Sequence, residues 1–148
     1  MKLRPSEQSL RKIELFPTGS LLPDPRNVRK HPAKQIKKLR KAISTFGFAS
    51  PIVVDEIRMV LAGHARLEAA VQLGLDKVPC IQLVGLSPEQ KTAFALCDNK
   101  LGDESTFDDR GLNALLKDLA SAGFDMELTG FDMGEIDFRI DGAAGGMM

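Results

Sequence analysis

Met59-Val60-Leu61-Ala62-Gly63-His64-Ala65-Arg66-Leu67-Glu68-Ala69-Ala70 is the stretch that decides the fold, because it joins two kinds of structure through one glycine. The apolar run 59–61 predicts a short buried strand, and the Ala, Leu and Glu pattern after Gly63 predicts a helix. A helix that follows a strand so directly starts with unpaired backbone N–H groups, which favour an anion together with the helix dipole. His64 can donate a hydrogen bond there, and Arg66 can bind a phosphate with two. We therefore predict a phosphate site at this turn.

The composition indicates a soluble globular protein. The chain has 148 residues, of which 43% are hydrophobic and 27% charged, and this length suits one domain with a core. No apolar run approaches the roughly 20 residues that cross a bilayer, and residues 1–5 lack the apolar segment of a signal peptide. Cys80 and Cys97 lie in apolar patterns without metal-ligand spacing. We expect a cytoplasmic protein with reduced thiols and no membrane contact.

The net charge of zero hides an uneven distribution. Residues 1–45 carry 12 Lys and Arg against 3 Asp and Glu, whereas residues 98–148 carry 4 against 12. The basic part could face the phosphates of a nucleotide or a nucleic acid. Alternatively, the two parts could be solvated surfaces that attract each other in the fold.

The hydrophobic pattern predicts alternating short strands and helices. We expect strands at 13–16, 51–54, 57–61 and 77–84, and helices at 33–46, 64–73, 88–100, from Asp108 or Asp109 to Gly123, and 131–140. Pro79 indicates that its strand begins late or lies at an edge. Three of the helices are expected to bury apolar residues, namely Ile36, Leu39, Ile43 and Phe46; Ala93, Phe94, Leu96 and Cys97; and Leu112, Leu115, Leu116 and Leu119.

Three further segments have a functional and an ordinary interpretation. The proline-rich loop 18–32 holds Arg26 and Arg29, which suit either anion capture or a solvated turn. The lysines of helix 33–46 form either a DNA-binding face or a solvated one. Asp98 and Asn99, near the end of helix 88–100, could contact a cation or nucleotide, or simply end the helix. The tail 141–148 has linker composition, which indicates a frayed end or a connection to another domain.

The order of the motifs resembles the ParB/sulfiredoxin-like superfamily. The residues that carry the resemblance are the Pro-Arg loop, the basic helix ending in Phe-Gly-Phe, Pro-Ile-Val-Val, Ala-Gly-His-x-Arg-Leu-Glu-Ala-Ala, Leu-Gly-Leu, Val-Pro-Cys-Ile and Asp-Asn-Lys-Leu. They cover about residues 13–105, and Leu-Thr-Gly-Phe-Asp at 128–132 extends the likeness to about residue 138. The pattern is most similar to the ParB-like N-terminal domains that are found in phage and plasmid proteins and ahead of DNA methyltransferase modules.

The resemblance implies a compact α+β fold, with a small mixed sheet, helices around it and a helical C-terminal part. It implies a nucleoside triphosphate as ligand, since the matching turn holds CTP in ParB and ATP in sulfiredoxin and the free-serine kinases. By this carry-over Gly63, His64 and Arg66 contact phosphate, and Arg26 and Arg29 match the first, loop motif. Two further residues match the third motif, which helps bind nucleotide and Mg²⁺ in ParB; they are Asp98 and Asn99.

The sequence also departs from the family pattern. ParB carries Gly-Glu-Arg-Arg where this chain has Gly63-His64-Ala65-Arg66, which leaves the base and the DNA-gated clamp open. Sulfiredoxin needs a cysteine at this motif, and positions 62–66 contain none, so sulfinic acid reduction is not expected. Cys80 is expected in the core. The acidic residues beyond Asp98 do not suit the DNA-reading helix-turn-helix that follows this domain in ParB.

Four functional hypotheses follow. The first is a nucleotide-binding regulatory module, or slow NTPase, in DNA modification or partition, with DNA, a methyltransferase or a second copy of the chain as partners. The second is a kinase or nuclease in which His64 and Asp98 are catalytic, with Asp24 or Glu68 as weaker candidates. The third is DNA binding by helix 33–46, and the fourth is an interaction domain with a vestigial pocket. The predicted parts are a lead-in at 1–12, the nucleotide-binding domain at 13–105, a helical extension at 106–140 and a tail at 141–148.

Overall fold

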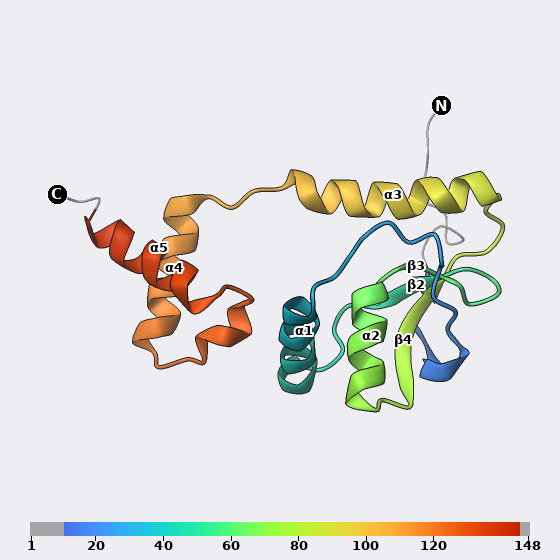
Figure 1. Ribbon diagram of the computed structural model, residues 1–148, viewed down its shortest axis with the longest axis horizontal. Coiled ribbons are helices and arrows are strands. Elements are labelled where there is room, and N and C mark those ends of the chain that lie inside the picture. The colour runs from blue at the N-terminus through green and yellow to red at the C-terminus, as the bar shows by residue number, and fades with distance from the viewer. Residues whose placement is uncertain (1–10, 146–148) are drawn as a thin grey trace. The chain divides into compact units, whose positions relative to one another are not determined.

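The computed structural model describes the backbone of residues 11–145 and the side chains of residues 11–141. Its contacts divide the chain into two units, Met1–Gly102 and Asp103–Met148. The first unit holds the sheet, and the second is helical (Figure 1). None of the helices in the described part of the chain is both long and apolar enough to cross a bilayer.

The first unit is built on a mixed four-stranded sheet, as the α+β prediction requires. The strands are β1 (Glu14–Pro17), β2 (Ile52–Val54), β3 (Val60–Ala62) and β4 (Lys77–Gln82), in the spatial order β1-β4-β2-β3. β4 runs antiparallel to β1 and parallel to β2, and β2 runs antiparallel to β3. The main core of this unit is formed by Phe16, Leu21, Ile52, Val54, Val60, Leu67, Ala70, Val78 and Cys80. The expected core position of Cys80 is therefore confirmed.

The prediction for Pro79 was wrong, because β4 begins at Lys77 and lies inside the sheet. Pro79 stands opposite Leu15 of β1. The parallel pairing with β2 begins only at the next residue, where Cys80 stands opposite Ile52. The ladder with β2 thus starts after the residue that lacks an N–H group, and the strand can be interior despite its proline.

Two helices pack against each other beside the sheet (Figure 1). They are α1 (Ala33–Phe46) and α2 (His64–Leu73). Ile36 of α1 is buried against two alanines of α2, Ala65 and Ala69, whose small side chains let the helices approach closely. Leu39 and Ile43 pack at the same contact, as predicted. Phe46 does not, because it lies on the last turn and remains 59% exposed.

The long helix α3 (Pro88–Glu104) begins as predicted but packs differently. Ser87 Oγ accepts from the N–H of Gln90, and Gln90 Oε1 accepts from the N–H of Ser87, which is a reciprocal capping box. No described residue of α3 is buried. Of the four residues expected in the core, three are exposed and Phe94 is half-buried; the exposed ones are Ala93, Leu96 and Cys97. The apolar residues of α3 were therefore wrongly assigned to the core.

The second unit contains α4 (Asp109–Ser121), a 3-10 turn η2 (Met126–Thr129) and α5 (Met133–Gly145). Asp108 caps α4 by accepting from the N–H of Gly111 at 3.2 Å. The core of this unit consists of Leu112, Leu116, Met126 and Ile136, with Leu119, Phe131 and Ile140 packed around it. Leu115 was expected in this core but faces solvent. α5 extends through residues 141–145, which were expected to be tail, and residues 146–148 lie outside the described part.

Candidate nucleotide site

The strand-to-helix turn is built as predicted, and Gly63 makes it possible. Its φ of +106° lies in the region that side chains disfavour. A Cβ on Gly63 would lie 3.3 Å from Ile52 Cα and 3.1 Å from Arg66 Nη2. Gly63 is also the residue before α2, so no side chain caps this helix. Among the described residues, no side chain caps the first N–H groups of α2, which leaves them suited to an anion.

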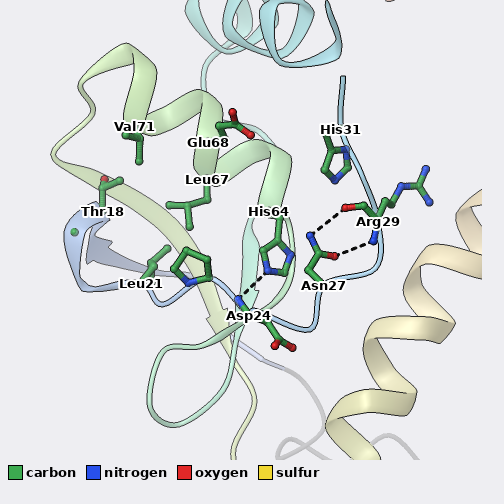
Figure 2. Close-up of a pocket in the computed structure, with 12 residues that line it drawn as sticks. Thr18, Leu21, Asp24, Asn27, Arg29, His31, His64, Leu67, Glu68 and Val71 are labelled. Atoms are coloured by element: carbon green, nitrogen blue, oxygen red, sulfur yellow. Dashed lines mark hydrogen bonds between the residues drawn. The ribbon is translucent and has the colours of Figure 1, made fainter. Parts of the chain in front are cut away.

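A cavity of about 630 Å³ lies beside α2 (Figure 2). One wall is the loop that follows β1, including the short 3-10 turn η1 (Thr18–Ser20), and the other is α2. The lining residues are Thr18, Gly19, Leu21, Pro23, Asp24, Asn27, Arg29, His31, His64, Leu67, Glu68 and Val71. The volume is within the range of about 300–1,000 Å³ usual for small-molecule sites.

His64, the first residue of α2, is held in this wall by the loop. Its Nε2 accepts a hydrogen bond from the backbone N–H of Asp24 at 3.1 Å (Figure 2). Because Nε2 is the acceptor, the proton of the neutral ring is on Nδ1. Burial lowers the pKa of His64 below its ordinary value, the nearby Asp24 opposes this shift, and His31 adds to it. At neutral pH His64 is therefore a hydrogen-bond donor through Nδ1 rather than a cation.

The loop that faces His64 is held together by its own short side chains. Asp24 Oδ1 accepts from the N–H of Arg26 at 2.9 Å. Asn27 accepts from the N–H of Arg29 and donates to the carbonyl of Arg29, both at 3.2 Å. These contacts hold the loop beside His64, with Asn27 between His64 and Arg29, and the guanidinium of Arg29 points away from His64 (Figure 2).

Arg26 and Arg66 do not line this cavity. Arg26 Nη2 lies 3.5 Å from Thr92 Oγ1 of α3. Arg66 Nη2 donates to the carbonyl of Pro51 at 2.8 Å, and Arg66 Nε is buried without a hydrogen-bond partner among the described residues. Burial lowers the pKa of Arg66, and the charge of Asp98 opposes this shift, so Asp98 acts on the guanidinium electrostatically. The phosphate role of Arg66 remains a prediction.

Asp98 and Asn99 lie within α3, which continues to Glu104, so the alternative interpretation that they end the helix was wrong. Asp98 is exposed and Asn99 is half-buried. Among the described residues, no group of three or more His, Cys, Asp or Glu side chains could hold a metal ion. Mg²⁺ usually binds one or two carboxylates together with substrate phosphates. Asp98 fits that use only if a bound nucleotide supplies further ligands, and its metal and catalytic roles remain predictions.

Sequence reasoning missed the side of α2 that completes the cavity. His64, Leu67, Glu68 and Val71 recur at helical spacing and share one face of α2. Glu68 was named only as a weak catalytic candidate, and Leu67 and Val71 were not named as site residues. Their helical spacing from His64 was the sequence signal that could have identified them. Thr18 and Leu21 could not be found in this way, because they come from the loop after β1.

Two family models match the sequence. The first, described as ParB N-terminal domain, matches residues 4–100. The second, described as ParB-methyltransferase HTH domain, matches residues 111–146. The segment beyond Asp98 thus matches a helix-turn-helix family, which its charge had not indicated, and the expectation that it does not read DNA stays a prediction. The match covers the segment in which α4 and α5 pack around a common core.

Curated relatives include a ParB-like nuclease domain-containing protein, YnaK, of Escherichia coli K12. It is 41% identical over 80 residues, covering 54% of this chain and 92% of the relative. A nucleoid occlusion protein of Bacillus cereus is 37% identical over 76 residues, covering 49% of this chain and 26% of the relative. A nucleoid occlusion protein of Listeria monocytogenes is 29% identical over 107 residues, which covers 68% of this chain and 37% of the relative. The chain thus matches nearly all of YnaK but only part of the occlusion proteins.

Solved structures of low sequence identity share the fold. The C-terminally truncated chromosome-partitioning protein ParB of Caulobacter crescentus, complexed with CTP-γ-S, matches with a TM-score of 0.66 at 16% identity. The match covers 89% of this chain and 86% of that one. The same ParB complexed to the centromeric parS site matches with a TM-score of 0.51 at 18% identity. This match covers 86% of this chain and 64% of that one.

Proposed function

This chain belongs to the ParB N-terminal domain family, and from that premise we propose that its cavity binds a nucleoside triphosphate. The observation that carries the proposal is the meeting of the uncapped start of α2 with a cavity of about 630 Å³. CTP is the first nucleotide to test, because the related Caulobacter structure contains CTP-γ-S. ATP is the second candidate.

The phosphates would lie at the α2 end of the cavity. The first N–H groups of α2 and the Nδ1–H of His64 all donate, and none requires a charged side chain. Glu68 lines the cavity one turn further along α2, and its carboxylate would repel phosphate. This arrangement favours one orientation, with the phosphates at His64 and the nucleoside further along the helix.

The nucleoside would lie on the apolar part of the wall. Leu21 and Leu67 are buried side chains of the core that also reach the cavity, and Val71 extends this surface. Such a surface can pack against a base or sugar ring, while Thr18 and Glu68 provide oxygens beside it. Comparing the binding of CTP with that of ATP tests which base fits this surface.

Arg66 and Asp98 would join the site when phosphate is bound. Arg66 has a buried Nε without a partner among the described residues, which is an unfavourable state for a donor. We propose that the guanidinium leaves the carbonyl of Pro51 and turns to the phosphates. Asp98 already acts on Arg66 electrostatically, and with Asn99 it would hold a nucleotide-bound Mg²⁺.

Calorimetric titration of the full chain with CTP or ATP, with and without Mg²⁺, tests the proposal. We expect saturable binding that weakens about tenfold or more in His64→Ala and Arg66→Ala, because each removes a donor to phosphate. Lys77→Ala removes an exposed cation at the start of β4, outside the cavity, and should bind like the unchanged protein. Equal binding by all four proteins would remove the phosphate site from α2.

The biological role we propose is regulation of a DNA-related process. The support is kinship with nucleoid occlusion proteins and the match of residues 111–146 to the ParB-methyltransferase HTH domain. A DNA methyltransferase, DNA and a second copy of the chain are the proposed partners. Nucleotide-dependent change in the sedimentation of the chain would test the last of these.

A second candidate function is DNA binding through α1. The observation that favours this function is that α1 packs on α2 through Ile36, while two lysines of α1 remain exposed to solvent. They are Lys34 and Lys37. Binding of this kind must weaken steeply as salt rises. Fluorescence anisotropy with a labelled duplex, at about 50 and 200 mM salt, would detect it.

The enzymatic alternative is hydrolysis of a nucleotide or of DNA, with His64 and Asp98 as the catalytic residues. Release of the hydrolysis product, compared between the unchanged chain and His64→Ala, tests it.

A further inference from the structure

The chain contains two histidines, and the structure places both on the wall of one cavity. His31 comes from the end of the loop before α1, and His64 is the first residue of α2. Figure 2 shows the two rings facing the same space between loop and helix. They are also close enough for His31 to influence the titration of His64. The pair is thus a shared feature of the candidate site.

Within the described part of the chain, each ring is oriented by one hydrogen bond through one nitrogen, and the other nitrogen is the one considered for a ligand. His64 uses Nε2 to accept from the backbone of Asp24 and keeps Nδ1–H as a donor. His31 Nδ1 lies 2.8 Å from Gln35 Oε1 on the first turn of α1. An amide oxygen only accepts, so the proton of His31 is on Nδ1, and Nε2 is the atom that gains a proton when the ring becomes cationic.

Among the residues that line the cavity with His31, the charged ones come from two elements. The loop contributes Asp24 and Arg29, whose guanidinium points away from His64, and α2 contributes Glu68 beside the neutral His64. The contact of His31 on α1 is the neutral Gln35. Because His64 is a neutral donor, His31 is the histidine of the pair that can supply a positive charge to an anion in the cavity. A phosphate beside an imidazole raises the pKa of the ring and favours the imidazolium.

We propose that His31 is a second phosphate ligand of this site and takes up a proton when nucleotide binds. One proton moves from solvent to His31 Nε2, and the new N–H donates to a phosphate oxygen, while Nδ1–H stays on Gln35. This inference rests on the proposed nucleotide function. It makes binding stronger as the pH falls toward the ordinary range of imidazole titration.

Two measurements on the full chain test the inference. Titration with CTP in buffers of different ionisation enthalpy, near pH 7, gives the number of protons taken up. We expect net uptake that is larger than in His31→Gln, and about tenfold weaker binding by that variant near pH 6.5. The matched control is Lys30→Gln, which removes a neighbouring exposed cation outside the cavity and should keep the proton uptake.

Proton NMR provides the second measurement, because the unchanged chain has only two histidine ring signals to follow. The ring signal that is absent from the spectrum of His31→Gln belongs to His31. In the unchanged chain, this signal should titrate at higher pH with CTP than without it. If CTP binds but neither this shift nor the difference in proton uptake occurs, His31 is not a ligand and the nucleotide proposal stands. If neither CTP nor ATP binds the unchanged chain, both proposals are wrong.

Discussion

Lys91 Nζ lies 3.1 Å from Asp55 Oδ2, and this ion pair joins the first turn of α3 to the turn between β2 and β3. Glu56 Oε1 contacts the same ammonium at 2.7 Å. Asp55 is buried, and its other oxygen accepts from the N–H groups of Ile57 and Met59 at 3.0 and 2.8 Å. One carboxylate thus shapes the turn and anchors the helix that carries Asp98.

The two partners of this pair should differ in their effect on stability. Asp55→Ala leaves two backbone donors without an acceptor, and we expect the free energy of unfolding to fall by about 2–3 kcal/mol. Lys91→Ala should cost less, because Asp55 keeps its two backbone donors even though its buried carboxylate loses the cation. Urea unfolding measures both. A larger loss for Lys91→Ala would mean that the ion pair, not the turn, is the main contribution.

Gly63→Ala should damage the turn beneath the candidate site. The new Cβ would adopt a φ of +106° and lie 3.3 Å from the backbone of Ile52. We expect a loss of about 1–3 kcal/mol in the free energy of unfolding, together with weaker nucleotide binding. Gly74→Ala is the matched control, because its φ of +70° is also positive but nothing lies within 4 Å of the added Cβ. Equal losses would show that conformation, rather than crowding at Ile52, sets the cost.

The turn at Gly63 and the apolar face of α1 were predictable because they depend on residues close together in sequence. Gly63 falls where a strand pattern changes to a helix pattern, and Ile36, Leu39 and Ile43 recur at helical spacing. Arg66 was harder to place, since its partner is the carbonyl of Pro51, fifteen residues away. The exposure of α3 was also not predictable, because an apolar residue in a helix does not reveal whether another element packs on it.

The two cysteines should differ in reactivity. Burial raises the pKa of the Cys80 thiol to about 11, and Cys80 is inaccessible within β4, whereas Cys97 is exposed on α3. The thiolate is the reactive form, so iodoacetamide near pH 8 should modify Cys97 alone in the native protein. Both should react after unfolding. Mass spectrometry identifies the modified residue, and rapid native modification of Cys80 would contradict the closed core of the sheet.

Stability should depend on the titration of His64. Burial lowers the pKa of His64 in the folded chain, so the unfolded chain binds a proton at higher pH than the folded one. Neutral His64 therefore stabilises the fold at pH values above 6.5, the ordinary pKa of the imidazole. This stabilisation is lost as the pH falls below that value. Urea unfolding from about pH 7.5 to 5 should show a shallower pH dependence in His64→Gln. His31→Gln should retain most of this pH dependence, because burial is the larger cause of the lowered His64 pKa and His31 only adds to it. Equal slopes in unchanged protein and His64→Gln would contradict this account.

The helical unit after Gly102 poses a problem of charge, since it matches a helix-turn-helix model yet is acidic. The described side chains of α5 carry Glu135, Asp137 and Asp141 against Arg139. Arg139 is itself engaged, because Nη1 contacts Asp109 at 3.0 Å and Asn113 at 3.2 Å. A DNA-reading helix needs positive charge toward phosphate, and α5 presents the opposite sign.

We therefore predict that α5 does not contribute to the DNA binding proposed for this chain. Arg139→Gln should leave duplex binding by the full chain unchanged, whereas Lys34→Gln combined with Lys37→Gln on α1 should weaken it. Because the α1 variant removes two cations, it should also make the dependence of log affinity on log salt shallower by about two. Fluorescence anisotropy at several salt concentrations measures both quantities. If Arg139→Gln weakens binding and the α1 variant does not, the acidic unit contacts DNA, and Arg139 exchanges Asp109 for a phosphate when it binds.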